Sequence, residues 1–299
     1  MSWFDLSGRH RAIAERTERA HAARLPLGPD GIVIGAHPIR LDASRTHAVL
    51  LVHGFNDTPQ SVSPLASAVH AAGWTVVAPL LPGHGRSLPV LATESRADAW
   101  LACVRDAYTA LRTSHETVVL CGLSMGGALC TLLAAEHPGV PALVLLAPYL
   151  GTSWLLNLQL FGLWLAQPFT PYFNGSGGTR SIHDPEARVR ALGPGVNTAR
   201  LLIELRTIAI AAESALPSLR MPTLYLQSRE DNRITESAAI RHFAMLNTPV
   251  REQRWLTGCG HIITADYCRL EVARQVIEWF ARYGPHDGAR KLEGRVGNE

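Results

Sequence analysis

Short apolar runs alternate with amphipathic stretches along most of the chain after residue 30. Each apolar run is typical of a strand buried on both faces of a sheet. The stretches between the runs repeat apolar residues every three or four positions, as in a helix with one face packed on a sheet. This alternation predicts a mostly parallel sheet with helices on both faces. The expected elements are an opening hairpin at 31–41, strands at 48–52, 74–79, 117–121, 142–147, 223–227 and 252–256, and helices at 63–72, 94–112, 125–136, 236–246 and 266–282.

One long segment interrupts the alternation. About 75 residues separate the strand that ends at Ala147 from the strand that begins at Thr223, and a connection in an α/β sheet usually needs far fewer. Within this insert, residues 154–165 are apolar on nearly every side, but the run is too short to span a bilayer. We interpret it as a buried cap helix or as an apolar lid over a substrate pocket. A helix at 198–214 is expected to lead back to the core.

The predicted organisation is one α/β core with an inserted cap. The core comprises residues 31–150 and 216–284, and the cap comprises residues 151–215. Residues 1–30 form an extension rich in Arg and Ala, which we interpret as solvated or as a basic helix on an anionic membrane surface. The polar residues 285–299 are expected to form a mobile tail.

Composition excludes several classes of protein. The 299 residues include 28 Lys and Arg and 25 Asp and Glu, which gives a net charge of +3, and 47% of them are hydrophobic. Disorder would need low hydrophobicity and high net charge. The small basic excess is spread along the chain, so no nucleic-acid partner is expected. No apolar signal segment opens the sequence, which predicts a cytoplasmic location. The oligomeric state stays open.

The five cysteines form an odd set without CxxC spacing. Three of them lie within apolar runs, where a free thiol behaves as a small buried hydrophobe. We therefore expect no disulfide framework. The sequence also shows no cluster of metal ligands, and neither a metal nor a cofactor is predicted. The cysteines are Cys103, Cys121, Cys130, Cys259 and Cys268.

The pattern Gly122-Leu-Ser124-Met-Gly126 follows a predicted strand and opens a predicted helix. In that context a G-x-S-x-G sequence forms a strained turn that exposes the serine hydroxyl at the end of the strand. A serine hydroxyl is a poor nucleophile unless a base removes its proton and an acid orients the base. Ser124 is therefore the candidate nucleophile.

Chain order selects the base and the acid, because both follow the serine in this layout. His261 lies beside two glycines in a loop between the last predicted strand and the last predicted helix, and we assign it as the base. Asp231 follows the strand at 223–227, and we favour it as the acid over the adjacent Glu230. The other histidines considered lie at helix ends, within a helix or in the insert: His115, His137, His183 and His242.

Stabilising an oxyanion requires two backbone N–H groups. One is expected from Met125, which follows the nucleophile, and the other from Phe55, in the loop after the first core strand. The Phe55 ring is also expected to line the substrate pocket, together with Trp154 and Trp164 of the insert. We interpret the nearby His53 as a brace for the loop.

These motifs resemble those of the α/β-hydrolase superfamily, and most of all its branch of bacterial monoacylglycerol lipases and carboxylesterases. The resemblance runs from about residue 39 to residue 283. It implies an α/β-hydrolase fold with an inserted cap, a triad of Ser124, His261 and Asp231, and an oxyanion hole formed by Phe55 and Met125. The matching segments are residues 52–55, 80–87, 122–127, 230–234 and 258–261, with the helix around Trp100 and residues 183–188 of the insert.

The sequence thus predicts a cofactor-free serine hydrolase of carboxylic esters with apolar acyl groups, such as medium-chain acyl esters or monoacylglycerols. The chain departs from the family at Arg233, where a small or apolar residue is frequent, and in its Trp-rich insert. Both departures concern the substrate and not the chemistry.

Three alternatives stay open on the sequence alone. The same triad can cleave an amide, a thioester or a carbon–carbon bond, because specificity resides in the cap. A second alternative is a binding protein that keeps the hydrolase fold but has lost catalytic activity. The complete triad argues against it. Transient contact of the cap or the N-terminal extension with a lipid interface is also considered. A haloalkane dehalogenase is disfavoured, because that chemistry needs a carboxylate at position 124.

Overall fold

The computed structural model describes residues 6–151, 162, 171–175 and 178–284. Within these ranges seven strands form one sheet in the order β1–β3–β2–β4–β5–β8–β9. β1 is antiparallel to β3, and all other neighbouring strands are parallel. The mostly parallel sheet is therefore confirmed. The strands are β1 (Ile39–Leu41), β2 (His47–Val52), β3 (Thr75–Ala78), β4 (Thr117–Leu123), β5 (Leu143–Leu146), β8 (Thr223–Ser228) and β9 (Arg251–Leu256).

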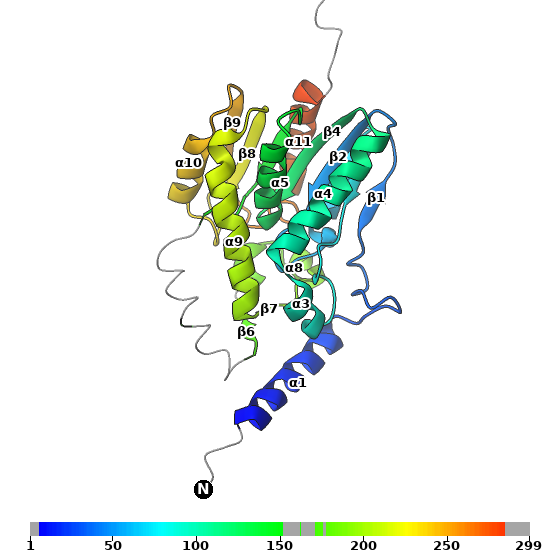
Figure 1. Cartoon of the computed structure of the whole chain (residues 1–299), viewed down its shortest axis with the longest axis vertical. Helices are drawn as coiled ribbons and strands as arrows, with labels where there is room; N and C mark the ends of the chain where they lie inside the picture. The colour runs from blue at the N-terminus through cyan, green and yellow to red at the C-terminus, as the bar shows by residue number, and fades with distance from the viewer. Residues whose placement is uncertain (1–5, 152–161, 163–170, 176–177, 285–299) are drawn as a thin grey trace, which may run out of the picture.

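Helices cover both faces of the sheet (Figure 1). Successive residues of a strand point to opposite faces, so Leu50 packs with α4, α5 and α9, whereas Val49 and Leu51 pack with α2 and α11. Two apolar layers result, which explains why these strands are apolar throughout. The helices around the sheet are α2 (Ser63–Ala71), α3 (Leu88–Glu94), α4 (Ala97–Ser114), α5 (Met125–Glu136), α9 (Ala199–Ala215), α10 (Glu236–Met245) and α11 (Arg269–Tyr283), with short 3₁₀ turns at Pro59–Val62 and Leu216–Ser218.

Most predicted elements occur with shifted ends, but the hairpin predicted at 31–41 is wrong. Ile39 of β1 lies opposite Ala78 of β3 instead, so the partner of this edge strand is distant in sequence. Pro38, just before β1, has no N–H to donate to a neighbouring strand. The helix predicted at 94–112 is also preceded by α3, which was not predicted, and the chain is extended at Ser95 between the two helices.

The described part of the insert contains small elements near the carboxyl end of the sheet (Figure 1). They are β6 (Phe173–Asn174), β7 (Val196–Asn197), α7 (Gly178–Ser181) and α8 (Pro185–Arg190). α9 follows them where a helix was predicted, and it packs against α5. The cap helix expected at 154–165 and the tail at 285–299 lie outside the described residues. The predicted domain boundaries stay predictions.

The N-terminal extension forms helix α1 (Leu6–Arg24), which projects from the sheet toward the insert (Figure 1). The Tyr172 hydroxyl donates to Glu18 Oε1 at 2.9 Å, and Arg24 donates to the carbonyl of Gly193. This end of the extension therefore contacts the insert. Among the described helices, none combines the length and the apolar character needed to cross a bilayer.

Candidate active site

Ser124 occupies a sharp turn between β4 and α5. Its φ angle is +54°, a conformation that residues other than glycine rarely adopt. Two glycines make the turn sterically feasible. A Cβ atom on Gly122 would lie 2.2 Å from the carbonyl oxygen of Gly126, and one on Gly126 would lie 2.2 Å from that of Val52. The G-x-S-x-G pattern thus produces the strained turn that the sequence predicts.

A continuous chain of hydrogen bonds links Ser124, His261 and Asp231. The Ser124 hydroxyl lies 2.8 Å from His261 Nε2, and His261 Nδ1 lies 2.8 Å from Asp231 Oδ2. The three residues follow β4, β9 and β8, whose carboxyl ends meet at one edge of the sheet. All three side chains are nearly inaccessible to solvent. The structure therefore brings together the nucleophile, base and acid predicted from the sequence.

Asp231 is held as an ionised acceptor. Its Oδ2 atom accepts from Gln227 Nε2 at 2.7 Å as well as from His261, and its Oδ1 atom accepts the N–H groups of Arg233 and Ile234 at 2.7 and 2.9 Å. Burial alone would raise the pKa of Asp231, but the interaction with His261 when that ring is protonated and the hydrogen bonds from His261 and these N–H groups lower it. The carboxylate stays charged and can fix the orientation of the imidazole.

The neighbouring Glu230 points elsewhere. Its Oε1 atom accepts the N–H of Gly258 at 2.6 Å, and its Oε2 atom lies 3.6 Å from His183 Nδ1. Glu230 therefore anchors the start of the loop that carries His261 and makes no contact with the base itself. The preference for Asp231 over Glu230 agrees with this geometry.

The two residues expected to donate to an oxyanion flank Ser124. Met125 is the first residue of α5, so its N–H has no carbonyl one turn earlier in the helix to accept it. A Cβ atom on Gly54 would lie 3.4 Å from Ser124 Cβ, which places the adjacent Phe55 beside the nucleophile. Among the described residues, the Phe55 N–H has no hydrogen-bond acceptor. Two unsatisfied donors thus lie next to the hydroxyl.

His53 braces the loop that carries Phe55, as the sequence suggests. Its Nδ1–H donates to the carbonyl of Gly54 at 2.9 Å, and its Nε2 accepts the N–H of Leu81 at 3.1 Å. Burial, together with the nearby His84, lowers the pKa of His53 to about 3. His53 is therefore neutral, and both ring nitrogens are occupied by backbone groups.

A cavity of about 620 Å³ opens beside Ser124 and His261. Phe55 and Tyr149 both line it, and Tyr149 is not among the residues named from the sequence. The remaining apolar residues of the wall come mainly from the insert, α9 and the His261 loop: Ile182, Ala187, Ala191, Leu202, Leu205 and Ile262. The predicted pocket residues Trp154 and Trp164 lie outside the described residues. A cavity of this size and lining suits an apolar group of moderate length.

Asp57 is an acidic residue of the cavity wall that sequence reasoning missed. Its Oδ1 atom accepts the N–H of Thr58 at 2.8 Å, but its Oδ2 atom is buried and has no hydrogen-bond partner among the described residues. Burial raises the pKa of Asp57 to about 6. Asp57 lies two residues after the expected oxyanion donor Phe55, and this position in the sequence could have indicated that it lines the cavity.

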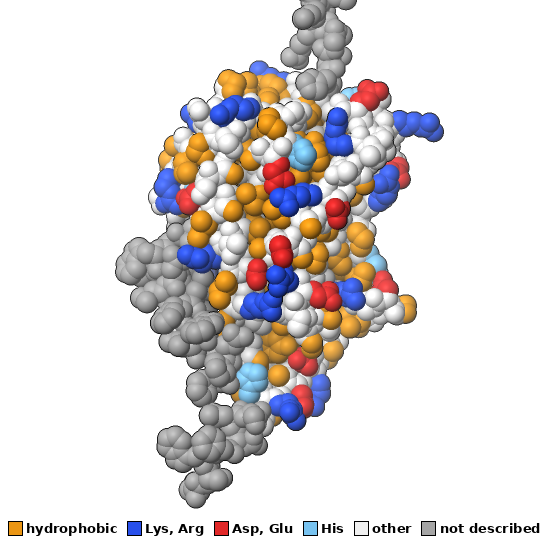
Figure 2. Space-filling model, viewed as in Figure 1, with side chains coloured by type: hydrophobic (Ala, Val, Ile, Leu, Met, Phe, Trp, Pro, Cys, Tyr) orange, Lys and Arg blue, Asp and Glu red, His pale blue; other side chains and the backbone are white. Residues whose placement is uncertain are grey.

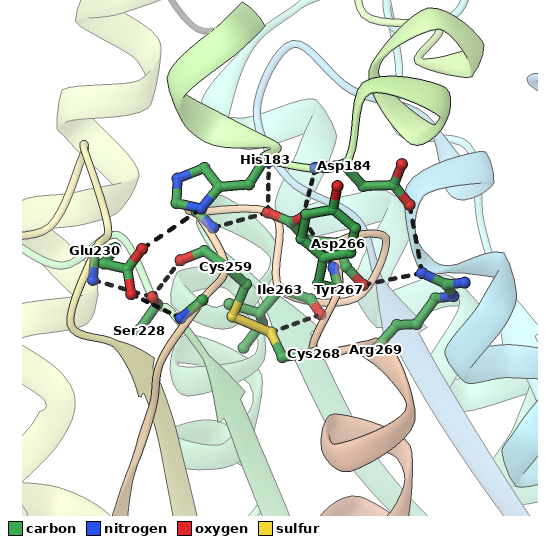
Figure 3. Close-up of a disulfide and its surroundings, with 12 residues drawn as sticks. His183, Asp184, Ser228, Glu230, Cys259, Ile263, Asp266, Tyr267, Cys268 and Arg269 are labelled. Carbon is green, nitrogen blue, oxygen red and sulfur yellow. Dashed lines mark hydrogen bonds and ion pairs between the residues drawn. A yellow bond between two sulfur atoms is a disulfide. The ribbon is translucent and has the colours of Figure 1, made fainter.

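A disulfide between Cys259 and Cys268 closes the loop that carries His261 (Figure 3). The expectation that no disulfide forms is therefore wrong. An odd number of cysteines does not prevent one pair from forming, and the loop between these two folds back on itself, with their Cα atoms 5.9 Å apart. Such bonds are rare in the cytosol. The predicted cytoplasmic location stays a prediction.

Asp266 ties the same loop to the insert. Its carboxylate accepts four backbone N–H groups: those of His183, Asp184, Gly260 and Tyr267, at 2.7 to 2.9 Å (Figure 3). Burial would raise the pKa of Asp266, but these hydrogen bonds lower it. In addition, the N–H of Ile262 donates to the carbonyl of Ser181 at 2.9 Å. The insert therefore helps to position the loop around His261.

We expect the double substitution Cys259→Ser and Cys268→Ser to destabilise the protein. A cross-link that closes a loop of about ten residues lowers the conformational entropy of the unfolded chain. This raises the free energy of unfolding by about 2.7 kcal/mol. For a domain of this size the midpoint of thermal unfolding should fall by roughly 5 °C. Thermal unfolding followed by circular dichroism measures the change.

The wild type under reducing conditions provides the matched comparison for this prediction. A reductant should lower its unfolding midpoint toward that of the double variant and should leave the double variant unchanged. Equal midpoints for wild type and double variant without reductant would contradict a stabilising disulfide.

Comparisons with known proteins agree with this fold and site. The family model described as serine aminopeptidase, S33 (Hydrolase_4) matches residues 43–267. The chain is 28% identical over 252 residues to a thermostable monoacylglycerol lipase of Bacillus sp. strain H-257, which covers 84% of this chain and 97% of the lipase. It is 25% identical over 236 residues to a carboxylesterase of Bacillus subtilis strain 168, which covers 79% of this chain and 92% of the esterase.

Solved structures show the same architecture. A structure from the study of LipS and LipT, two metagenome-derived lipolytic enzymes, superposes with a TM-score of 0.76 at 27% identity, and the match covers 84% of this chain and all of the other. The match of the family model includes Ser124, Asp231 and His261 and spans most of the sheet. From its sheet, its serine turn and this match, the chain belongs to the α/β-hydrolase family described as serine aminopeptidase, S33.

Proposed function

We propose that the protein is a serine hydrolase that cleaves carboxylic esters through Ser124, His261 and Asp231. The observation that carries the proposal is the hydrogen-bonded chain from the Ser124 hydroxyl through His261 to Asp231, with both links at 2.8 Å. Nucleophile, base and orienting acid must be in mutual contact in this way for a serine to attack a carbonyl.

The geometry supports a two-step reaction. His261 Nε2 removes the proton of Ser124 as Oγ attacks the ester carbonyl carbon. The N–H groups of Phe55 and Met125 stabilise the resulting oxyanion, and collapse of the intermediate releases the alcohol with a proton from His261. Water then attacks the acyl-enzyme by the same route and releases the acid. Asp231 stabilises the imidazolium without taking its proton.

The cavity wall supports an apolar acyl group. Aliphatic side chains of α8, α9 and the His261 loop lie on the wall, and Phe55 adds an aromatic surface. The relatives are named a monoacylglycerol lipase and a carboxylesterase. We therefore propose medium-chain acyl esters, including monoacylglycerols, as the substrates.

A panel of substrates tests this function. We expect para-nitrophenyl esters to be hydrolysed with a maximum of kcat/KM at medium acyl length, because longer chains bury more apolar surface until the cavity is filled. The matched anilides, a thioester and a vinylogous diketone should be turned over at least about a hundredfold more slowly. A higher kcat/KM for the anilide, the thioester or the diketone than for every ester would overturn the ester assignment.

A further inference from the structure

Arginine is the main charged residue of the cavity wall. Its described lining includes five arginines but only one carboxylate, that of Asp57. The arginines are Arg24 of α1, Arg188 and Arg190 of α8, Arg233 of the loop after β8, and Arg269 of α11. The cavity beside Ser124 therefore carries a large excess of positive charge, assembled from four separate segments of the chain.

Three of these guanidinium groups have no carboxylate partner among the described residues. Arg24 and Arg188 donate to backbone carbonyl groups of the insert. Arg233 has no side-chain hydrogen bond or ion pair within the same part of the chain. A carbonyl group orients a guanidinium but does not neutralise it. These three positive charges therefore remain available to a bound anion.

The other two arginines are only partly compensated. Arg190 lies 3.9 Å from Glu186, and both side chains are largely exposed. Arg269 lies 3.5 Å from Asp184, and its side chain is 40% exposed. Solvent-exposed pairs of this kind contribute little and leave the local potential positive.

Some arginines outside the cavity are, by contrast, paired with carboxylates. On the outer surface, Arg105 pairs with Glu136 and Arg274 pairs with Glu271, each at 2.5 Å. Figure 2 shows positive and negative side chains interspersed over the face that it presents. The sequence of residues 152–170 contains no Asp or Glu, so this part of the insert cannot supply a carboxylate to the cavity.

Arg233 is the cavity arginine that lies nearest to a residue of the proposed triad along the chain. It lies two residues after the acid Asp231, and its N–H donates to that carboxylate at 2.7 Å. Burial raises the pKa of Tyr149, and the nearby Arg233 charge opposes this rise. The N–H of Tyr149 in turn donates to the carbonyl of Ser124 at 3.1 Å. Arg233, Tyr149 and Ser124 all line the cavity.

We propose that the substrate ester carries an anionic group, a carboxylate or a phosphate, which Arg233 of the cavity wall binds while Ser124 attacks the ester carbonyl. This inference rests on the proposed ester hydrolysis and narrows its substrate class. A guanidinium group presents parallel N–H donors that match the oxygens of either anion. Uncompensated arginines at a cavity also attract anions from solution and speed their association.

Two matched pairs of esters test the proposal. The mono-para-nitrophenyl ester of glutarate and para-nitrophenyl pentanoate differ by a charge on the acyl side. Octanoylglycerol phosphate and octanoylglycerol differ by a charge on the alcohol side. In at least one pair we expect a kcat/KM about tenfold higher for the anionic member. The pair that shows it identifies the side of the ester that carries the anion. This preference should fall as salt is added, because salt screens the attraction.

The substitution Arg233→Gln removes the charge and keeps much of the length of the side chain. We expect the ratio of kcat/KM for the anionic ester to that for the neutral ester to fall about tenfold, since a charge-assisted hydrogen bond is lost. Arg220→Gln is the matched control. Arg220 is exposed, lies outside the cavity wall and donates to the carbonyl groups of Pro217 and Leu219. The control should leave the ratio unchanged.

Equal kcat/KM values within both pairs would overturn the proposal, and so would an anionic preference that Arg233→Gln leaves intact. In either case the proposed ester hydrolysis would stand, because it is tested separately by activity on the neutral esters and by the loss of that activity in Ser124→Ala. If no ester is hydrolysed, the binding of small anions to the protein tests the proposed anion site. Glutarate or glycerol phosphate should then raise the thermal unfolding midpoint of the wild type more than that of Arg233→Gln, with glycerol as the neutral control. Equal shifts would overturn the anion site.

Discussion

Replacing Ser124 by alanine is expected to reduce ester hydrolysis by about 10⁴-fold to 10⁶-fold. The substitution removes the atom that forms the acyl-enzyme, and only the oxyanion donors and substrate binding remain. The fold should persist, because alanine is smaller than serine and the Ser124 hydroxyl bonds only to His261 among the described residues. The measurement is kcat/KM for a para-nitrophenyl ester of medium acyl length.

A second readout separates loss of chemistry from loss of folding. A fluorophosphonate should label the wild type, but not Ser124→Ala, while both proteins give the same circular dichroism spectrum. Ser218→Ala is the matched control, because Ser218 is exposed and donates only to the carbonyl of Ala215. Activity retained in a folded Ser124→Ala protein would refute the assignment of the nucleophile.

Replacing Asp231 by asparagine is expected to lower kcat by about 10⁴-fold. The carboxylate accepts a hydrogen bond from the Nδ1–H of His261 at 2.8 Å, which leaves Nε2 free to accept the proton of Ser124. An amide is neutral and can turn its NH₂ group toward the ring, which favours the wrong tautomer. Steady-state kinetics on the same ester measure the loss.

Glu230→Gln is the matched partner for this experiment, because it makes the same chemical change one residue earlier. Glu230 contacts Gly258 and His183 and not the base, so its substitution should change kcat less than about tenfold. If Glu230→Gln lost most of the activity and Asp231→Asn kept it, the acid would have to be reassigned.

Ser124 and Asp231 could be predicted from the sequence because each follows an apolar strand, whereas chain order and two flanking glycines selected His261. The apolar runs before Ser124 and Asp231 are buried strands β4 and β8, and their flanking residues must emerge at the carboxyl edge of the sheet. Positions 122 and 126 must be glycine, because a Cβ atom at either one would collide with nearby backbone atoms. Such constraints act over a few residues, so they are visible in the sequence.

Features that depend on contacts between distant segments could not be predicted in the same way. The partner of β1 is β3, and no pattern near residue 39 specifies that choice. The role of Asp266 depends on the insert, since His183 and Asp184 lie more than 80 residues earlier in the chain. The arginines of the cavity wall come from both ends of the chain as well as from the insert. No single stretch of sequence shows their convergence.

The hydrogen bonds of Asp266 limit how the insert could be exchanged between related hydrolases. His183 and Asp184 of the insert supply N–H groups to Asp266, and the Ser181 carbonyl accepts the N–H of Ile262. Gly260 lies against the same segment, where a Cβ atom would come within 2.6 Å of the carbonyl oxygen of Ser181. Because these are backbone groups, a chimaera that changes the path of residues 181–184 is expected to disturb the loop of the base as well as the pocket. An exchange of the insert would have to preserve this backbone path.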